Sequence, residues 1–275
     1  MPGKPKASPI NIALIGCGKM GGALLRGWLK AKITKHVHVL EPAGLKGFGK
    51  SVTVHKDAAS FLKAKAKADV YVLAVKPQVM DDVCRSIAAA IPSGALVLSI
   101  AAGQTISSFE KRFGAKQPIV RAMPNLPASI GEGITVAVAN KRVSAKQKKQ
   151  ADSILRAAGL VEWVDKESLL DPVTALSGSG PAYVFLLIEA LAEAGKKAGL
   201  TADLSMKLAR QTVIGAAALA GAEPGIPAET LRKNVTSPGG TTEAALKVLM
   251  QNGDLQALFD RAIAAASARA GQLSQ

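Results

Sequence analysis

The feature that most constrains the fold of this chain is a glycine pattern between an apolar run and a helical pattern. Gly16, Gly18 and Gly21 follow the apolar residues 10–15 and open a helical pattern over 19–31. GxGxxG in this context is typical of a dinucleotide-binding loop, where glycine permits a tight turn, a close approach of backbone to pyrophosphate, and close packing of helix on strand. The helix N-terminus then faces the phosphates with free N–H groups. The residues expected to bind the dinucleotide here are Gly16, Gly18, Lys19, Met20 and Gly21.

The first part of the chain, up to residue 165, alternates short apolar runs with helical patterns. The apolar runs predict strands at 10–15, 37–40, 51–54, 69–75, 95–100, 119–122, 134–138 and 161–164. The patterns between them predict helices at 19–31, 57–67, 77–90 and 144–157. Asp57 and Ser144 are the expected N-caps of the second and fourth. Apolar strands separated by helices predict an α/β fold with a parallel, doubly wound sheet of the Rossmann type.

Strand patterns give way to helical ones after residue 165. The helices are expected at 166–176, 181–198, 202–221, 227–234, 240–252 and 254–272. We therefore predict a flexible tail at 1–9, a dinucleotide-binding Rossmann domain at 10–165 and an all-α domain at 166–275. Residues 184–194 are apolar on too many sides for an exposed surface helix, which favours self-association over the alternative, a compact monomeric bundle.

Composition narrows the classes of function. The formal net charge is +15, yet the lysines are spread along the chain and no aromatic platform is interleaved with their denser runs, so we expect no nucleic-acid partner. The charge instead suits an anionic cofactor and substrate, or plain solubility. The sequence contains no run of about 18 apolar residues and no secretion signal, so we expect a cytoplasmic protein without a membrane segment. Its two cysteines and three histidines predict neither a disulfide framework nor a metal site.

Glu41 lies at the end of the second expected strand, 41 − 21 = 20 residues after Gly21. An acidic residue at this place hydrogen-bonds the ribose hydroxyls of NAD, and its charge repels the extra phosphate of NADP. The alternative is a surface glutamate at a strand end. Cys17 lies inside the loop, but nothing in the sequence supplies it with a base, so we interpret it as a tolerated small residue.

Further candidates follow the later strands, where ligands of open α/β sheets bind. Small residues there let the backbone approach the nicotinamide, and a lysine is suited to a phosphate or the ribose. These candidates are Ala74, Val75, Lys76, Pro77, Ala101, Ala102, Gly103 and Asn125. The structural alternatives are that Pro77 starts a helix, Gly103 makes a turn, and Asn125 fixes a turn before Pro127.

The helical part contains two stretches of hydroxyl and glycine residues, each directly before a strongly apolar helix. They read Leu-Ser-Gly-Ser-Gly-Pro-Ala-Tyr at 176–183 and Asn-Val-Thr-Ser-Pro-Gly-Gly-Thr-Thr at 234–242. Each offers backbone N–H groups and small hydroxyls at a helix N-terminus, which suits a carboxylate. The alternative is two ordinary N-caps, at Ser179 and at Thr241 or Thr242, although a cap needs only one hydroxyl.

Together these motifs resemble those of pyrroline-5-carboxylate reductase, over residues 10–272 and in the family's order. The resemblance implies NAD(P)H-dependent reduction of 1-pyrroline-5-carboxylate to L-proline, the last step of proline biosynthesis. It also implies a Rossmann domain followed by a helical dimerisation domain that intertwines with its partner, often in a decamer built from dimers.

The resemblance also implies roles for individual residues. Thr242 falls beside the ring nitrogen as the catalytic residue, and Asn234 falls where the family contacts the cofactor. The hydroxyl and backbone groups of the Ser-Pro-Gly-Gly-Thr stretch hold the substrate carboxylate. The residues implied in substrate binding are Ser177, Ser179, Val235, Thr236, Ser237, Gly239, Gly240, Thr241 and Thr242.

Two candidates for cofactor binding depart from the family pattern. Glu41 stands where many members that prefer NADPH carry small polar residues, and Asp57 replaces an asparagine expected near the adenosine. These departures favour NADH, or the use of both NADH and NADPH.

The histidines His36, His38 and His55 all fall near the second and third expected strands, away from the hydride site. Ketone reduction requires a proton donor, whereas a protonated imine is already electrophilic, so this lack of a donor fits an imine substrate. Two alternatives remain open. One is a hydroxyacid dehydrogenase that uses Lys196 or Lys197, and the other is a dinucleotide-sensing regulatory protein without turnover.

Overall fold

The computed structural model describes residues 9–65 and 67–274. Within them the chain divides into two compact units: one holds the residues through Gly178 and those from Ala266 onward, and the other holds Ser179–Ala265. The domain boundary expected at 165/166 stays a prediction. The flexible tail expected at 1–9 lies outside the described residues, except for Pro9.

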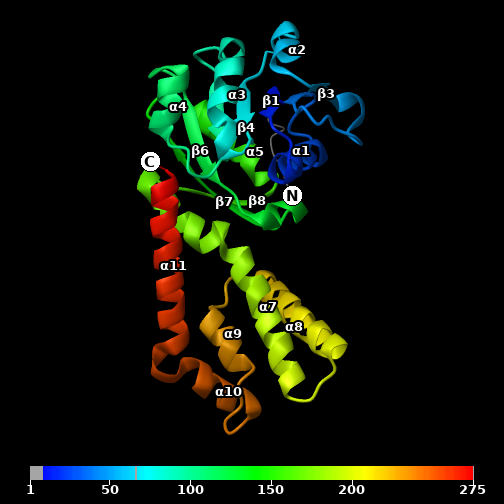
Figure 1. The fold of residues 1–275 in the computed structure, drawn as a ribbon, viewed down its shortest axis with the longest axis vertical. Coiled ribbons are helices and arrows are strands. Elements are labelled where there is room, and N and C mark those ends of the chain that lie inside the picture. The colour runs from blue at the N-terminus through cyan, green and yellow to red at the C-terminus, as the bar shows by residue number, and fades with distance from the viewer. Residues whose placement is uncertain (1–8, 66, 275) are drawn as a thin grey trace. The chain divides into compact units, whose positions relative to one another are not determined.

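Among the described residues, the first unit is built on an eight-stranded sheet in the order β3-β2-β1-β4-β5-β6-β7-β8 (Figure 1). Its strands are β1 (Ile12–Ile15), β2 (Val37–Leu40), β3 (Val52–His55), β4 (Val70–Leu73), β5 (Leu96–Ser99), β6 (Ile119–Met123), β7 (Gly133–Ala139) and β8 (Gly159–Trp163). Strand pairs are parallel from β3 through β6. The winding reverses between β1 and β4, which is the point where open sheets of this kind bind ligands. The Rossmann-type prediction is confirmed.

β7 runs antiparallel to β6, which corrects the expectation of a wholly parallel sheet. The residues between them, 124–132, form only a short 3₁₀ turn at Leu126–Ile130. A parallel pair needs a crossover of about a dozen or more residues, usually with a helix, so a connection this short makes the chain turn back.

Helices cover both faces of the sheet (Figure 1). The helices of this unit are α1 (Lys19–Ala31), α2 (Ala58–Lys63), α3 (Met80–Ile87), α4 (Ile106–Phe113), α5 (Ala145–Arg156) and α6 (Leu170–Val173). The core under α1 and α5 includes the buried Trp28, and the core under α2, α3 and α4 includes the buried Phe61. Both expected N-caps are confirmed: Asp57 accepts a hydrogen bond from Ser60 N, and Ser144 forms a capping box with Gln147.

Two helices differ from the sequence-based expectations. α4 was not predicted, although Thr105 caps it and apolar residues recur at Ile106, Phe109 and Phe113. Its eight residues give only a short helical pattern, which its charged residues obscure. α2 ends at Lys63 rather than at residue 67. Shorter 3₁₀ and π turns lie at Gly49–Ser51, Pro77–Val79, Ala88–Ala90, Glu167–Leu169, Thr174–Gly178 and Gln251–Gly253.

The second unit is helical, as predicted. Its helices are α7 (Gly180–Lys197), α8 (Ala202–Ala222), α9 (Ala228–Asn234), α10 (Thr241–Met250) and the first part of α11 (Asp254–Leu273). Among the described residues of Ser179–Ala265, only Ala192, Ser205 and Ala209 are buried. A bundle that buries so little cannot be stable alone, because the hydrophobic effect scales with the apolar area removed from water.

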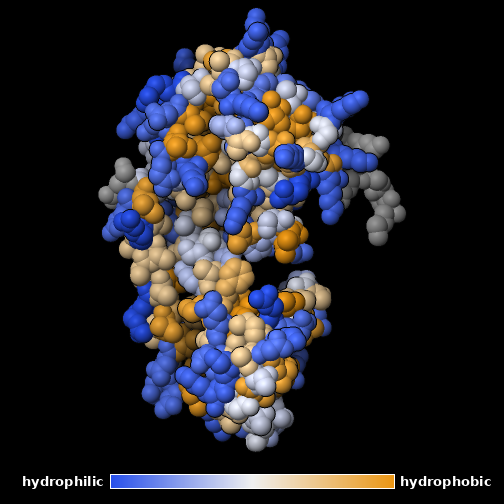
Figure 2. Space-filling model, turned by 45° about the vertical axis from the view of Figure 1, so that its right-hand side comes forward, coloured by the Kyte–Doolittle hydropathy of each residue, from blue (hydrophilic) through white to orange (hydrophobic). Residues whose placement is uncertain are grey.

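The surface of this unit is rich in large apolar side chains (Figure 2). On α7 these include Val184, Phe185, Leu186, Leu187 and Leu191, each at least 43% exposed. This many exposed large apolar side chains on one helix mark an interaction surface.

By length and composition alone, the helix Glu167–Lys197 is apolar enough to cross a membrane, whereas the sequence analysis expected no such segment. Small residues raise its average apolarity without forming an unbroken apolar run. One such helix is weak evidence for a membrane span, because an apolar helix that packs against another protein surface passes the same test.

Candidate active site

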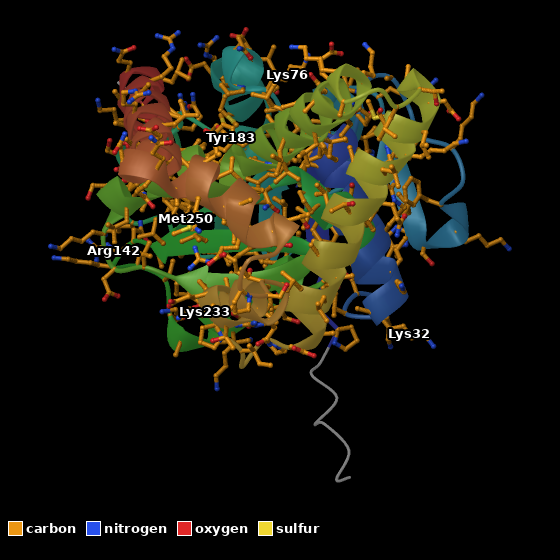
Figure 3. All side chains as sticks on the ribbon, turned by 90° about the horizontal axis from the view of Figure 1, so that it is seen from below. Lys32, Lys76, Arg142, Tyr183, Lys233 and Met250 are labelled. Carbon is orange, nitrogen blue, oxygen red and sulfur yellow. The ribbon has the colours of Figure 1, made fainter. Side chains whose placement is uncertain are left out.

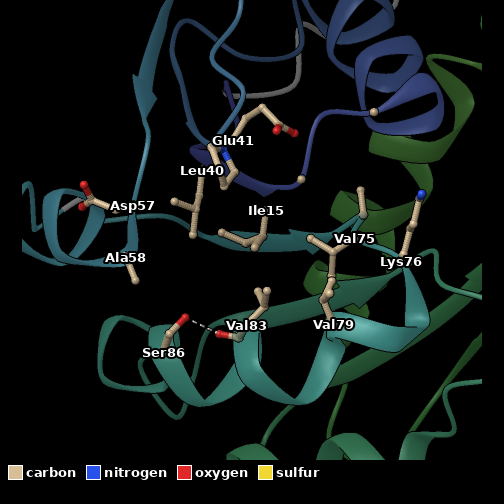
Figure 4. Close-up of a pocket in the computed structure, with 14 residues that line it drawn as sticks. Ile15, Leu40, Glu41, Asp57, Ala58, Val75, Lys76, Val79, Val83 and Ser86 are labelled. Carbon is tan, nitrogen blue, oxygen red and sulfur yellow. Dashed lines mark hydrogen bonds between the residues drawn. The ribbon is translucent and has the colours of Figure 1, made fainter.

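A pocket of about 480 Å³ opens at the carboxyl ends of β1, β2 and β4, where the winding of the sheet reverses (Figure 4). The cofactor candidates that line it are Gly16, Gly18, Glu41, Asp57, Ala74, Val75 and Lys76. Sequence reasoning missed its apolar wall, to which Ile15, Leu40, Val79 and Val83 contribute. Apolar walls with a few polar groups at the edges suit a flat ring that carries a sugar phosphate.

Each of the three glycines in the loop has a different structural role. Gly16 has φ +88°, and a Cβ there would lie 2.7 Å from Val75 Cγ1, so it makes the tight turn. A Cβ on Gly21 would lie 2.5 Å from Gly16 O and 3.2 Å from Ala74 Cβ, which confirms close packing of helix on strand. Among the described residues, no atom lies within 4 Å of a Cβ on Gly18. The space beside Gly18 therefore fits a ligand phosphate approaching the backbone.

Two carboxylates lie at one end of this pocket and Lys76 at the other (Figure 4). Glu41 accepts hydrogen bonds from Cys17 N at 2.7 Å and Ala43 N at 3.2 Å, which hold its carboxylate beside the glycine loop. Asp57 accepts from Ser60 N at 2.7 Å, and this backbone hydrogen bond lowers the pKa of Asp57. The Asp57 side chain is therefore anionic at neutral pH, where it opposes a further phosphate on the ribose.

Iodoacetamide at neutral pH is expected to leave Cys17 unmodified in the folded protein. Burial, and then the neighbouring Glu41, raise the pKa of this thiol to about 11, and only the thiolate reacts. Burial likewise raises the pKa of Cys84 to about 11. Peptide mass spectrometry measures the labelling, with denatured protein as the control in which both cysteines react. Fast labelling of folded Cys17 would contradict this assignment.

The remaining cofactor candidates of the first unit lie outside the residues that line this pocket. Gly103 has φ +70°, and a Cβ there would lie 2.7 Å from Leu273 O, so the end of α11 covers this turn. Asn125 Oδ1 accepts from Ile134 N at 3.0 Å, and Pro77 opens a 3₁₀ turn. Pro77, Gly103 and Asn125 therefore have the structural roles that were given as alternatives to cofactor binding. The roles of these three residues in cofactor binding stay predictions, as do those of Lys19, Met20, Ala101 and Ala102.

The second hydroxyl-rich stretch forms a tight turn between α9 and α10. Gly240 N donates to Ser237 O at 3.0 Å, with Pro238 and Gly239 between them and Gly239 at φ +72°. Proline followed by a glycine with positive φ is the pattern of a type II turn. A Cβ on Gly240 would lie 2.6 Å from Ser237 Oγ and 3.1 Å from Ser237 O, so a side chain there would displace the Ser237 hydroxyl.

The turn leaves the hydroxyls of Thr241 and Thr242 available. α10 begins at Thr241, its N-cap is Gly240, and within the described residues no side-chain hydrogen bond caps it. The N-cap alternative for these two threonines is therefore wrong. The first N–H groups of the helix have no partner within the helix, and such groups bind anions.

Sequence reasoning missed Glu243, whose Oε2 accepts from Gly239 N at 2.8 Å. The signal was its position at the third residue of α10, where a glutamate commonly reaches back to the N-terminus of its helix. The N–H groups of Gly239 and Gly240 thus both have acceptors within the chain. The groups left for a carboxylate are the Ser237 hydroxyl and the first N–H groups of α10.

The first hydroxyl-rich stretch is divided between the two units. Ser177 Oγ donates to Val173 O at 3.1 Å, and a Cβ on Gly178 would lie 2.7 Å from Met123 Cε, the end of a flexible side chain. Ser179 precedes α7, and within the described residues no side-chain hydrogen bond caps that helix either. Ser179 is nevertheless the N-cap residue of α7, with Pro181 in the first turn, as the alternative has it.

A glycine loop at the switch point of a doubly wound sheet, joined to a separate helical unit, defines a Rossmann-type dinucleotide-binding protein. A family model described as pyrroline-5-carboxylate reductase dimerisation matches residues 167–273. A second, described as NADP oxidoreductase coenzyme F420-dependent, matches residues 11–103. The chain belongs to the pyrroline-5-carboxylate reductase family, which confirms the resemblance seen in its motifs.

Individual relatives agree along nearly the whole chain. Pyrroline-5-carboxylate reductase of Pseudomonas aeruginosa is 42% identical over 96% of this chain and 97% of its own length. The structure of the Coxiella burnetii enzyme superimposes with a TM-score of 0.88 at 41% identity, covering 98% of this chain and 100% of that one. The Plasmodium falciparum enzyme, solved with NADP bound, has a TM-score of 0.81 at 31% identity and covers 97% of this chain and 98% of that one.

Proposed function

We propose that this chain reduces 1-pyrroline-5-carboxylate to L-proline with NADPH or NADH as the reductant. The observation that carries the proposal is the pairing, in one chain of this family, of a dinucleotide pocket at the switch point with an uncapped, hydroxyl-rich helix N-terminus. The first suits the pyrophosphate and adenosine, and the second suits a carboxylate.

The bound nicotinamide supplies a hydride to the imine carbon. The chain contributes binding and orientation: the loop from Gly16 to Gly21 holds the pyrophosphate, and Glu41 meets the ribose hydroxyls. Ser237 and the first turn of α10 hold the substrate carboxylate, and the Thr242 hydroxyl hydrogen-bonds the ring nitrogen. A protonated imine is already electrophilic, so positioning is the main catalytic task. Asn234, Val235, Thr236, Ser177 and Ser179 complete the proposed contacts.

The test is oxidation of NADH and NADPH by the purified protein in the presence of racemic pyrroline-5-carboxylate, with proline measured as the product. Formation of proline matched to the loss of reduced cofactor supports the proposal. A panel of 2- and 3-hydroxy acids with the oxidised cofactors is the comparison. Lys196 at the end of α7 pairs with Glu193 at 2.7 Å, so it is already engaged on an exposed surface. Turnover of hydroxy acids without proline formation would contradict the proposal.

We infer from Glu41 and Asp57 that the chain uses NADH, or both cofactors, rather than NADPH alone. Glu41→Gln is expected to raise kcat/KM for NADPH about tenfold relative to NADH, because one like charge beside the ribose phosphate is removed. Glutamine still has an oxygen to accept from Cys17 N. Asp57→Asn is the matched variant, since asparagine caps a helix as well as aspartate does. Steady-state kinetics with both cofactors measures the ratio, and an unchanged ratio in both variants would remove these carboxylates from the account.

We propose that the chain self-associates through its helical part as a dimer, with the decamer as a further possibility, because the apolar surface of that unit needs a partner. A cytoplasmic location without membrane or nucleic-acid partners fits a small-molecule reductase. The basic side chains of Lys32 and Arg142 project outward from different edges of the ribbon (Figure 3), as a spread of solubilising charge does. We also propose that no metal takes part.

A further inference from the structure

Three histidines lie together at β2 and the edge strand β3: His36 directly before β2, His38 within β2 and His55 at the end of β3. His38 Nδ1 lies 3.1 Å from His55 Nε2, a hydrogen-bond distance, and the two rings stack with centroids 5.4 Å apart. The His36 ring meets His38 edge-on at 5.1 Å, and its Nε2 lies 2.9 Å from Thr53 Oγ1. The nicotinamide chemistry uses none of these rings, and within the described residues no group of three metal-ligating side chains is formed.

The histidine pair lies next to the carboxylate end of the dinucleotide pocket. In the register of the sheet Leu40 pairs with His55, and Glu41 N donates to His55 O at 2.9 Å. Asp57 follows His55 by two residues and lines the pocket. The charges of Asp57 and His55 also act on each other, since each favours the charged form of its neighbour.

The pair is neutral at neutral pH. Burial, and then the neighbouring rings of His36 and His55, lower the pKa of His38, and burial lowers the pKa of His55 against the opposing effects of Ser60 and Asp57. The other charged groups on the adjoining segments are Lys35 before β2, Glu41 after β2, Lys50 before β3, Lys56 after β3 and Lys63 on α2; all four lysines are exposed. When the pair is protonated, it takes up a single proton, which is shared across the 3.1 Å contact. A second proton is opposed because two cations so close repel each other.

We propose that the His38–His55 pair sets the dinucleotide preference by binding a proton. The neutral pair does not offset the negative charge of the Asp57 and Glu41 carboxylates, so the pocket favours the dinucleotide without a 2′-phosphate. The protonated pair offsets these carboxylates, and the pocket then accepts a dinucleotide that carries the phosphate. The inference rests on the proposed function only in assuming that the pocket binds a nicotinamide dinucleotide.

The test is calorimetric titration of NAD⁺ and NADP⁺ into the purified protein at about pH 8 and about pH 5, because the lowered pKa values of the pair place its titration below the usual histidine range. The affinity for NADP⁺ relative to NAD⁺ is expected to rise about fivefold at the lower pH, the effect of one charge within a Debye length. The double variant His38→Gln/His55→Gln is expected to lose most of this rise, and the control His36→Gln to retain it. The 2′-phosphate titrates in the same range, and the double variant measures that part separately.

A second measurement needs no substitution. Because binding linkage is reciprocal, NADP⁺ is expected to raise the pH midpoint of the pair's ring signals by about 0.7 units more than NAD⁺ does. The chain has only three histidines, so their NMR signals can be assigned one by one. Equal midpoints with both ligands, or an equal pH-dependent rise in the double variant, would overturn the proposal. A lack of binding by either dinucleotide at both pH values would overturn it together with the proposed function, whereas binding with a constant ratio overturns the histidine proposal alone.

Discussion

Thr242→Ala is expected to lower kcat about 100-fold with either cofactor, since a hydrogen bond to a charged group contributes about 1.5–3 kcal/mol. Thr242 is the second residue of α10, and its hydroxyl is not used as a cap. It is therefore free to hydrogen-bond the nitrogen of the substrate ring, where the electronic change of the reaction occurs. Steady-state kinetics with pyrroline-5-carboxylate measures the loss, and the KM for the cofactor is expected to stay close to its original value.

Two further variants separate catalysis from substrate binding. Thr242→Ser keeps the hydroxyl and is expected to retain most of the turnover. Ser237→Ala removes a hydroxyl proposed to hold the carboxylate, so it is expected mainly to raise the KM for the substrate. Unchanged kinetics in both Thr242→Ala and Ser237→Ala would remove the turn and the start of α10 from the active site.

Leu186→Asp is expected to abolish self-association at working protein concentrations and to inactivate the enzyme. Leu186 is 63% exposed on α7, within the apolar patch of the helical unit. In a two-fold interface each substitution occurs twice, and a buried unpaired carboxylate costs several kcal/mol, so the dimer is expected to weaken about 1,000-fold or more. Sedimentation velocity measures the change in mass.

The matched control is Leu160→Asp on β8, where the leucine is 66% exposed but lies in the first unit. The same substitution there is expected to leave the assembly intact. A Leu186→Asp protein that keeps its mass and activity would show that the α7 surface is not the interface.

Much of the fold could be predicted because buried parallel strands are continuous apolar runs, and the runs at Val37–Leu40 and Val70–Leu73 needed little context. The helices after residue 165 were equally clear, since glycines separate them. The direction of β7 was not predicted, because it follows from the length of a connection rather than from the strand's own residues. α4 was missed because eight residues show too few turns of an amphipathic pattern.

Part of the candidate site could likewise be predicted from the sequence, and part could not. The roles of Gly16 and Gly21 could be predicted because a motif with a known backbone geometry specifies them, and the contacts agree. The apolar wall at Val79 and Val83 could not, because it forms only where the 3₁₀ turn Pro77–Val79 and α3 line the same pocket as the ends of β1 and β2. The hydrogen bond from Gly239 to Glu243 depends on how a loop folds back on its own helix, which residue spacing alone does not fix.

The first unit is discontinuous in sequence, since it holds residues through Gly178 and those from Ala266 onward. The backbone of Leu273 packs against Gly103, so the last turn of α11 belongs to the packing of the loop after β5. A ribosome delivers residues in order, and domains formed early in the chain usually fold before later ones are made. Here the nascent sheet domain stays unfinished until the whole helical unit has emerged. The packing of the cofactor domain is therefore completed only after the helical unit has been synthesised, although most of that domain is synthesised first.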